Sequence, residues 1–377
     1  MNRGRIFVSQ FSPALLSGAL ALFVFVVGAP AQRLNQLPPA PAAPIYKPKP
    51  TPTPKPTPEE PLDVVRVTSN LVMVPVSVVD RQGQAVHGLQ VNDFRLDEAG
   101  QRQQITEIGD PEQVPLDIAL LFDISSSVSD KGFFEFQQKA AASFLRQVLK
   151  PADRAAVFTI GQEPKLVSPL ASAASTAATL LTIPAATTPV PTAFYDTVSV
   201  AAQYLMTNSM TGRRRVIMVI TDGDDNFSRL VQDLATAEYR ANNKGDETPA
   251  AARVSLQARH KQAVQEVQRV VQQADATFYS INPGGPSVRL NQISMRAELG
   301  MESIASATGG NAFVPESDKA LERVFNEVAA ELRGQYLLQY YSNSQLPSRQ
   351  FRSITVAIPG RADTRVRARQ GYYPKQQ

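Results

Sequence analysis

The sequence predicts an α/β protein: a doubly wound, mostly parallel sheet with helices on both faces, inserted in or flanked by a small β-sandwich. Three observations predict this class. Residues 115–334 alternate short apolar runs with helix-like stretches, the pattern of a doubly wound sheet. Within them, residues 118–122 and 216–220 are uninterrupted apolar runs, as expected of strands buried on both faces. Both ends of the chain instead contain strands that alternate polar and apolar residues, which predicts one buried face.

The first 31 residues have the features of an export signal. Arg3 and Arg5 supply positive charge, residues 15–28 are mostly apolar, and residues 29–31 fit a small-residue cleavage site. We expect cleavage after Ala31. The alternative is an uncleaved membrane anchor, although the apolar segment of about 14 residues is short for a span of about 20. In both cases the remainder would be exported and would work in the periplasm, the cell envelope or the secreted space.

Residues 32–61 form a linker in which proline recurs every second or third position from residue 38 onward. Such a composition builds no core and favours an extended polyproline II spacer. Recognition of this linker by a proline-binding groove of a partner is the alternative.

A small β-rich module is expected at residues 62–113. Its strands are predicted at 64–67, 71–79, 94–97 and 103–108, with a hairpin around residues 98–100. About 50 residues bury too little apolar surface to be comfortably stable alone. Three further strands are predicted within residues 335–373, at 335–341, 351–358 and 364–369. We infer that both sets join into one sandwich, with residues 115–334 inserted between them; two separate small modules are the alternative.

The inserted region is expected to alternate strands and helices in chain order. Its predicted strands are 118–122, 154–160, 165–170 at an edge, 216–222, 277–281 and 311–314. Its predicted helices are 133–150, 171–181, 193–206, 256–274 and 317–333. The polar insertion at 226–252 is expected to be a solvated excursion, with a partner-specific arm beside the metal as the alternative, and a glycine-containing stretch at 283–289 is a second candidate rim of the site.

Five oxygen-bearing residues are expected at the carboxyl ends of this sheet. Asp123, Ser125 and Ser127 follow one buried strand, Asp222 ends another, and Thr192 precedes a helix. Open α/β sheets place their sites at this edge. Oxygen ligands without His or thiolate select a hard cation such as Mg²⁺, Mn²⁺ or Ca²⁺.

Taken in chain order, Asp123, Ser125, Ser127, Thr192 and Asp222 resemble the metal-ion-dependent adhesion site of von Willebrand factor type A domains. The resemblance implies that Asp123, Ser125, Ser127 and Thr192 bind the ion directly and that Asp222 binds it directly or through water. A carboxylate of a protein partner would complete the octahedron. The chain departs from the family pattern chiefly at Ser126 and in the long insertion after Asp222.

The wider arrangement of export signal, proline-rich linker, type A core and β-rich tail resembles a group of exported bacterial proteins described as von Willebrand factor A-related, frequent in acidobacteria. The resemblance implies a non-enzymatic protein-binding module that serves cell adhesion or envelope assembly. It names neither the partner, the physiological metal nor the oligomeric state.

Composition excludes several other classes. The chain of 377 residues has no cysteine, which removes disulfides, thiolate catalysis and cysteine-based zinc sites. Its only histidines, His87 and His260, are expected to be surface residues. The net charge of +4 is scattered along the chain, and no nucleic-acid-binding motif is present.

Two alternatives to a binding module remain open from the sequence. Asp222, Asp224 and Asp225 form an acidic cluster that a metal-assisted hydrolase could use, but no general base or activated nucleophile accompanies it. Asp224 and Asp225 are therefore expected to be solvated loop carboxylates. The other alternative is a structural scaffold whose metal site is empty.

Overall fold

The computed structural model describes residues 71–125, 134–232, 249–285, 292–316, 318–344 and 349–374. These residues belong to one compact unit, Arg66–Gln377. The expected export signal (1–31), linker (32–61) and strand at 64–67 lie outside the described residues, as does the rim at 286–289. Within the described ranges, no helix is both long enough and apolar enough to cross a membrane.

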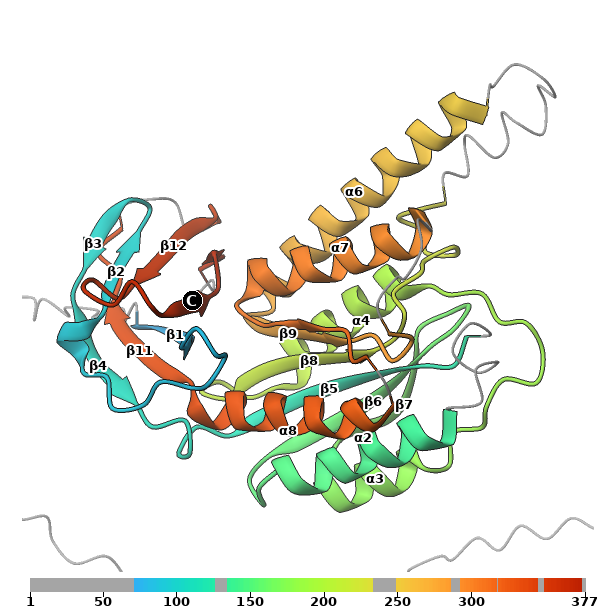
Figure 1. Ribbon diagram of the computed structural model, residues 1–377, viewed down its shortest axis with the longest axis horizontal. Coiled ribbons are helices and arrows are strands. Elements are labelled where there is room, and N and C mark those ends of the chain that lie inside the picture. The colour runs from blue at the N-terminus through green and yellow to red at the C-terminus, as the bar shows by residue number, and fades with distance from the viewer. Residues whose placement is uncertain are drawn as a thin grey trace, which may run out of the picture. The chain divides into compact units, whose positions relative to one another are not determined.

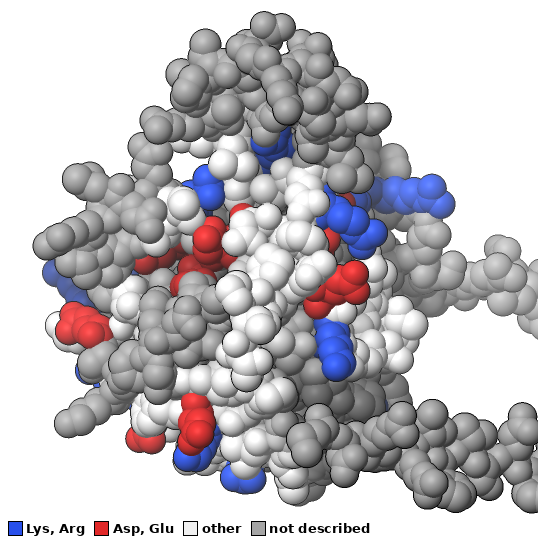
Figure 2. Space-filling model, turned by 90° about the vertical axis from the view of Figure 1, so that its right-hand side faces the viewer, with Lys and Arg blue, Asp and Glu red and all other residues white. Residues whose placement is uncertain are grey.

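A six-stranded sheet in the order β10-β9-β8-β5-β6-β7 forms the centre of the larger part of the chain (Figure 1). Every neighbouring pair is parallel except β6 and the edge strand β7, which are antiparallel. The strands are β5 (Leu116–Asp123), β6 (Arg154–Ile160), β7 (Lys165–Ala171), β8 (Arg214–Ile220), β9 (Ala276–Ile281) and β10 (Ala312–Phe313). The predicted doubly wound sheet is confirmed. Figure 2 views the edge at which β5 ends.

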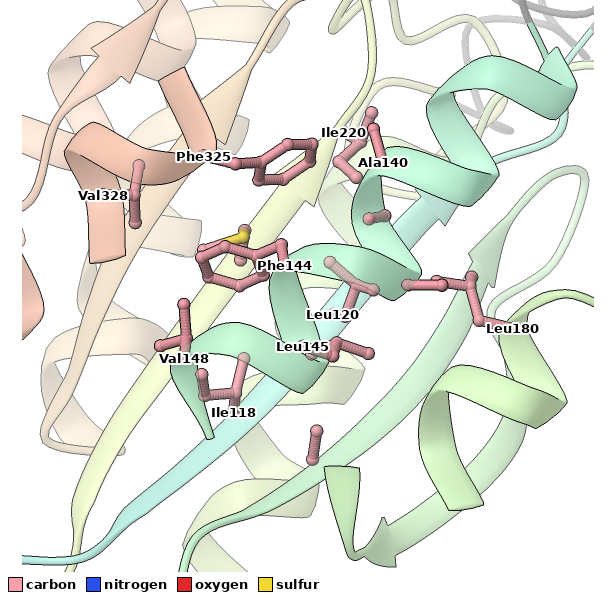
Figure 3. Packing of buried hydrophobic residues seen from close by; sticks show 14 of the residues in the cluster. Ile118, Leu120, Ala140, Phe144, Leu145, Val148, Leu180, Ile220, Phe325 and Val328 are labelled. Carbon is pink, nitrogen blue, oxygen red and sulfur yellow. The ribbon is translucent and has the colours of Figure 1, made fainter. Parts of the chain in front are cut away.

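Helices cover both faces of this sheet because the side chains of β5 alternate between two cores. Ile118 and Leu120 pack with one helix layer, whereas Ala119 and Leu121 pack with the other. The first layer consists of α2 (Phe134–Val148), α3 (Ala173–Leu180) and α8 (Asp318–Gly334), and Figure 3 shows its packing on β5 and β8. The second layer consists of α4 (Phe194–Asn208), α6 (Pro249–Gln273) and α7 (Gln292–Thr308). Each large apolar side chain buried in this way contributes roughly 1.5–3 kcal/mol.

The ends of the described chain form two four-stranded antiparallel sheets that enclose a third core. One sheet has the order β13-β1-β11-β4, and the other has the order β14-β12-β2-β3. The strands are β1 (Leu71–Val79), β2 (Arg95–Glu98), β3 (Gln101–Gln103), β4 (Ile105–Gly109), β11 (Tyr336–Tyr341), β12 (Arg352–Ala357), β13 (Arg365–Ala368) and β14 (Gly371–Tyr372). A 3₁₀ turn, η1 (Val91–Asp93), precedes β2. Both sheets combine strands from before and after the six-stranded sheet.

Two details of the fold differ from the sequence-based expectations. The single strand expected at 103–108 is two strands: β3 pairs with β2 in one sheet, and β4 pairs with β11 in the other. The chain therefore changes sheets at Gln104. Helix α7 was not predicted, because its apolar positions include Met295 and Leu299, which are 46% and 62% exposed and blur the helical pattern.

Polar contacts join the sandwich to the α/β region. Glu331 of α8 accepts hydrogen bonds from Ser77 of β1 (2.8 Å) and Tyr279 of β9 (3.0 Å), and it forms an ion pair with Arg367 of β13 (2.5 Å). Gln335, which follows α8, donates to Ser77 Oγ (3.3 Å) and Tyr279 Oη (3.2 Å). One carboxylate and one amide thus connect three strands that belong to two different sheets.

Candidate metal centre

Asp123 stands where β5 ends, at the carboxyl edge of the parallel sheet. The register of β5 with β8 places Phe122 opposite Ile220, so that Thr221 lies beside Asp123. The Thr221 hydroxyl donates to Asp123 Oδ2 (2.5 Å), and the Ser125 backbone N–H donates to Asp123 Oδ1 (2.7 Å). Two short hydrogen bonds therefore fix the orientation of this carboxylate.

Thr192 is held against the loop that follows Asp222. Its backbone N–H donates to Asn226 Oδ1 (2.9 Å), and its carbonyl accepts from the backbone N–H groups of Asn226 (3.1 Å) and Phe227 (3.0 Å). These hydrogen bonds join the loop between α3 and α4 to the loop after β8. The structure places Asp123, Ser125, Thr192 and Asp222 at one edge of the sheet; the predicted ligand Ser127 lies outside the described residues.

Electrostatics at this edge favour a cation. Asp123 is 1% exposed, and its burial, together with the charge of nearby Asp222, raises its pKa to about 6, although hydrogen bonds from Ser125 and Thr221 act in the opposite direction. Burial and the same Asp222 charge also raise the pKa of Asp224. On this face, acidic side chains form a small group on the described surface (Figure 2). A bound divalent cation would relieve the repulsion that Asp222 exerts on Asp123 and Asp224.

The donor set fits a hard cation. Among the described residues, no three His, Cys, Asp or Glu side chains come together, so hydroxyl oxygens have to complete any metal site. Ser125 and Thr192 are 1% and 3% exposed at the same edge of the sheet and could provide them. Carboxylate and hydroxyl oxygens suit Mg²⁺, Mn²⁺ or Ca²⁺ rather than a metal that prefers sulfur.

Asp225 is not the solvated carboxylate that the sequence suggested. It is 3% exposed and accepts four hydrogen bonds. The donors are the backbone N–H groups of Tyr195 (2.8 Å), Phe227 (3.2 Å) and Ser228 (3.0 Å) and the Ser228 hydroxyl (2.6 Å). Because Tyr195 lies in the first turn of α4, Asp225 anchors the start of that helix to the metal-site loop. Asp224 is half-buried, so neither carboxylate is a freely solvated loop residue.

His260 is likewise buried, contrary to its expected surface position. It is 3% exposed, and its Nδ1 lies 3.4 Å from the hydroxyl oxygen of Tyr195. Burial and the charges of Arg296 and Arg259 lower the pKa of His260 to about 4. The imidazole is therefore neutral at physiological pH. His87 is exposed, as expected.

Gly223 brings the metal-site loop into direct contact with α7. Its φ of +75° lies in the left-handed region, and a Cβ at this position would lie 2.6 Å from Met301 Cε and 3.3 Å from Ala297 Cβ. Only glycine combines this conformation with this close approach. The unpredicted helix α7 thus forms one wall behind the candidate centre.

Sequence reasoning missed two residues that shape the centre, Thr221 and Asn226. Thr221 is fully buried and connects Asp123 to the loop, since its Oγ1 also accepts from the Gly223 N–H (2.9 Å). A signal was available for Thr221: a hydroxyl residue stands between an apolar strand and the Asp-Gly pair. Asn226 gave no comparable signal, because its role depends on a loop 34 residues earlier in the chain.

Comparisons with known proteins agree with this description. The model of the von Willebrand factor type A domain family matches residues 117–327, more than half of the chain. No curated protein matches the chain.

Among solved structures, the chain is similar to proximal thread matrix protein 1 from the mussel byssus with a zinc-occupied MIDAS motif, at 15% identity and a TM-score of 0.40, covering 61% of this chain and 48% of that one. It is also similar to a von Willebrand factor type A protein from Catenulispora acidiphila (13% identity, TM-score 0.39, 71% and 51% covered). The PilB minor pilin from Streptococcus sanguinis shows 13% identity and a TM-score of 0.41, with 59% and 62% covered. The chain thus spans about half the length of the mussel protein.

Proposed function

Because the chain belongs to the von Willebrand factor type A domain family, we propose that its candidate centre holds a divalent cation and uses it to capture an acidic group of a protein partner. The observation that carries the proposal is the oriented, buried carboxylate of Asp123 beside Thr221 and near the charge of Asp222. Mg²⁺ or Mn²⁺ would be held by Asp123, Ser125, Ser127 and Thr192. Asp222 would bind the ion directly or through a water molecule. With few charged ligands, the cation keeps net positive charge for a partner's carboxylate.

A binding role is favoured over hydrolysis. The four hydrogen bonds to Asp225 occupy the carboxylate that a metal-assisted hydrolase would need as a second acid or base. His260 faces Tyr195 in the helix layer rather than a nucleophile. We therefore propose a non-enzymatic module. The sequence features of residues 1–31 support an exported location in the periplasm, cell envelope or secreted space, with adhesion or envelope assembly as the role.

Isothermal titration of Mg²⁺ and Mn²⁺ into the protein tests the cation site. We expect binding by the parent and none by Asp123→Ala, with circular dichroism showing that the variant is folded. Asp80→Ala is the matched control, because the Asp80 carboxylate lies in a turn of the sandwich, where it accepts hydrogen bonds from Gln82 N–H and Gln84 N–H. Retained binding in Asp123→Ala would place the cation elsewhere, and the absence of binding in the parent would favour a scaffold with an empty site.

Acetate serves as the probe for an open coordination position on the cation, which a partner's carboxylate would occupy. Mn²⁺ bound to the parent enhances water proton relaxation, and acetate that replaces a coordinated water should reduce this enhancement in a saturable way. Chloride at the same ionic strength serves as the control. An unchanged enhancement at saturating acetate would argue against an open coordination position and therefore against carboxylate capture.

A further inference from the structure

A groove of about 980 Å³ runs along the surface between α6 and α7. The two helices lie side by side and separate toward their starts (Figure 1). They approach closely in their second halves, because a Cβ added to Gly300 would lie only 3.2 Å from Val264 Cγ2. One turn later, Gln268 Nε2 donates to Ser303 Oγ (2.8 Å). The contact and the hydrogen bond between the helices close the floor of the groove.

Apolar side chains line both walls of this groove. Leu299, Met295 and Ile293 of α7 are 62%, 46% and 45% exposed. On the opposite wall, Leu256 and Val264 of α6 are half-buried. Single exposed apolar residues are ordinary on a protein surface, whereas a contiguous apolar patch marks an interaction site. The grouping of these five side chains along one groove therefore indicates a surface that another molecule covers.

The charged side chains that line the groove are both basic. They are Lys261 of α6 and Arg296 of α7, and no acidic side chain is among the lining residues that the structure describes. Arg296 lies near Asp224 of the metal-site loop, but the two form no ion pair in the described structure. His260 also lines the groove and is neutral at physiological pH, because its pKa is about 4. The groove thus combines apolar walls with a net positive charge.

The same helix α7 faces both the groove and the candidate metal centre. Ala297 and Met301 are buried and face Gly223 of the metal-site loop. Met295 and Leu299 stand on a different face of the helix and line the groove. Because the groove residues are not those that contact the loop, changes to them need not disturb the centre.

We propose that this groove binds an amphipathic α-helix of a protein partner, with an apolar stripe flanked by acidic residues. Two neighbouring helices form a channel into which the side-chain ridge of a third helix fits. The lining positions of α6 recur four residues apart from Leu256 to Gln268, a length of about 18 Å or about three helical turns. Met295 adds an apolar contact that adapts to the shape of the partner.

Charge determines which kind of helix fits. Lys261 and Arg296 would pair with acidic residues on the flanks of the bound helix, and a basic helix would be repelled. The groove of a second copy of this chain is a poor match, because it would bring the same positive charges together. The proposal goes beyond the capture of a carboxylate by the cation, since neither the groove nor its charges depend on a bound metal.

Fluorescence anisotropy with a labelled synthetic helix tests the proposal. The probe is a peptide of about 18 residues with Leu at i, i+3, i+4 and i+7 spacing and Glu on both flanks. The charge control carries Lys in place of each Glu. All titrations contain EDTA, so that the result does not depend on the metal centre and either proposal can fail alone. We expect saturable binding of the Glu peptide and binding of the Lys peptide that is weaker by about tenfold or more.

Two variants separate the apolar and the charged contributions. Leu299→Glu should weaken binding of the Glu peptide by about tenfold or more, because it replaces an apolar contact with a like charge. Met210→Glu is the matched control, since Met210 is 60% exposed and does not line the groove. Lys261→Glu should remove the preference for the Glu peptide over the Lys peptide. Lys165→Glu, at an exposed position of β7, should retain it.

Three outcomes would overturn the proposal. Equal affinity of the parent for both peptides would show that charge does not select the occupant. Unchanged affinity in Leu299→Glu would place the peptide elsewhere. A dimer of the parent in sedimentation that Leu299→Glu converts to a monomer would assign the groove to a second copy of the chain.

Nuclear magnetic resonance of the parent labelled with ¹³C at the methionine methyl groups gives a second test that does not depend on variant affinities. The Met295 signal, assigned with Met295→Leu, should shift when the Glu peptide is added to saturation. The Met210 signal should not move, because Met210 does not line the groove. An unchanged Met295 signal at saturating peptide would refute the proposed docking surface.

Discussion

Gly223 couples the candidate centre to α7 through its left-handed backbone and its contact with Met301. We expect Gly223→Ala to lower the free energy of unfolding by about 2 kcal/mol, since the left-handed backbone costs an alanine roughly 1–2 kcal/mol and the buried Met301 side chain has to move. Urea denaturation measures the loss. Gly212→Ala is the matched control: its φ is +82°, but no atom lies within 4 Å of the added Cβ. It should show the backbone effect alone.

The steric part of this effect can be isolated with Met301→Ala, which removes the atoms that the new Cβ would meet. In that background, Gly223→Ala should cost no more than Gly212→Ala. If the cost stayed unchanged, the contact between the loop and α7 would not be the cause.

His260 makes stability depend on pH. Its folded-state pKa of about 4 is below the usual value of about 6.5, so between these pH values the unfolded chain binds a proton that the folded protein does not. Acidification from pH 7 to pH 4 should therefore remove up to about 3 kcal/mol of stability in the parent that His260→Gln does not lose. Urea midpoints across this range measure the difference. His87→Gln, at an exposed position, is the control and should follow the parent; the same profile in all three proteins would contradict the assignment to His260.

At the scale of single elements, the residue that follows β8, Thr221, orients Asp123 of the candidate centre through its hydroxyl group. If the proposed cation site is correct, Thr221→Val should weaken Mn²⁺ binding about 10–100-fold, because it removes the donor that orients Asp123. Thr176→Val is the matched control: this fully buried threonine of α3 donates to the Ala155 carbonyl (3.0 Å), away from the centre. Both variants should lose about 1–2 kcal/mol of stability, but only Thr221→Val should lose metal affinity. Equal Mn²⁺ affinity in the two would show that Thr221 does not position Asp123.

Elements were predictable where the sequence pattern reflects burial on both faces. The strands that end at Asp123 and before Asp222 are continuous apolar runs, and their carboxyl ends were expected at one edge of the sheet. The break between β3 and β4 was not predictable in this way, because Gln104 gives no turn signal and the change of sheet depends on pairing with β11, more than 200 residues later. Burial of Asp225 and His260 was missed for the same reason, since α4 covers both.

At the scale of the whole molecule, we propose that the sandwich forms only when both ends of the chain are present. β1 pairs with β11 and β13, and Glu331 connects this sheet to α8 and β9. A fragment of residues 62–113 should therefore show no cooperative unfolding transition, whereas residues 62–377 should unfold with a single transition in which near- and far-ultraviolet circular dichroism coincide. Independent cooperative folding of the short fragment would establish two separate modules instead.

Glu331→Gln tests the connection between the sandwich and the α/β region. It keeps the shape of the side chain but removes the charge that pairs with Arg367. We expect a loss of a few kcal/mol of stability, because the pair is largely buried and Arg367 is left without its partner. Glu327→Gln, in an exposed pair with Arg323 on the same helix, should change stability by less than about 1 kcal/mol. Denaturant midpoints compare the two, and equal losses would show that the Glu331 contacts do not join the two regions.

The central position of β1 determines how the protein would respond to mechanical load. β1 is the first described strand, and it lies between two antiparallel neighbours, β11 and β13. A pulling force applied through the chain ahead of Leu71 therefore shears two rows of hydrogen bonds at once instead of opening one row bond by bond. A molecule attached through this end and loaded at the carboxyl edge of the six-stranded sheet, where the candidate metal centre lies, would therefore be pulled in the direction that shears both rows of hydrogen bonds. Single-molecule pulling between these two points should give a higher rupture force than pulling from the C-terminal end, where β14 is an edge strand.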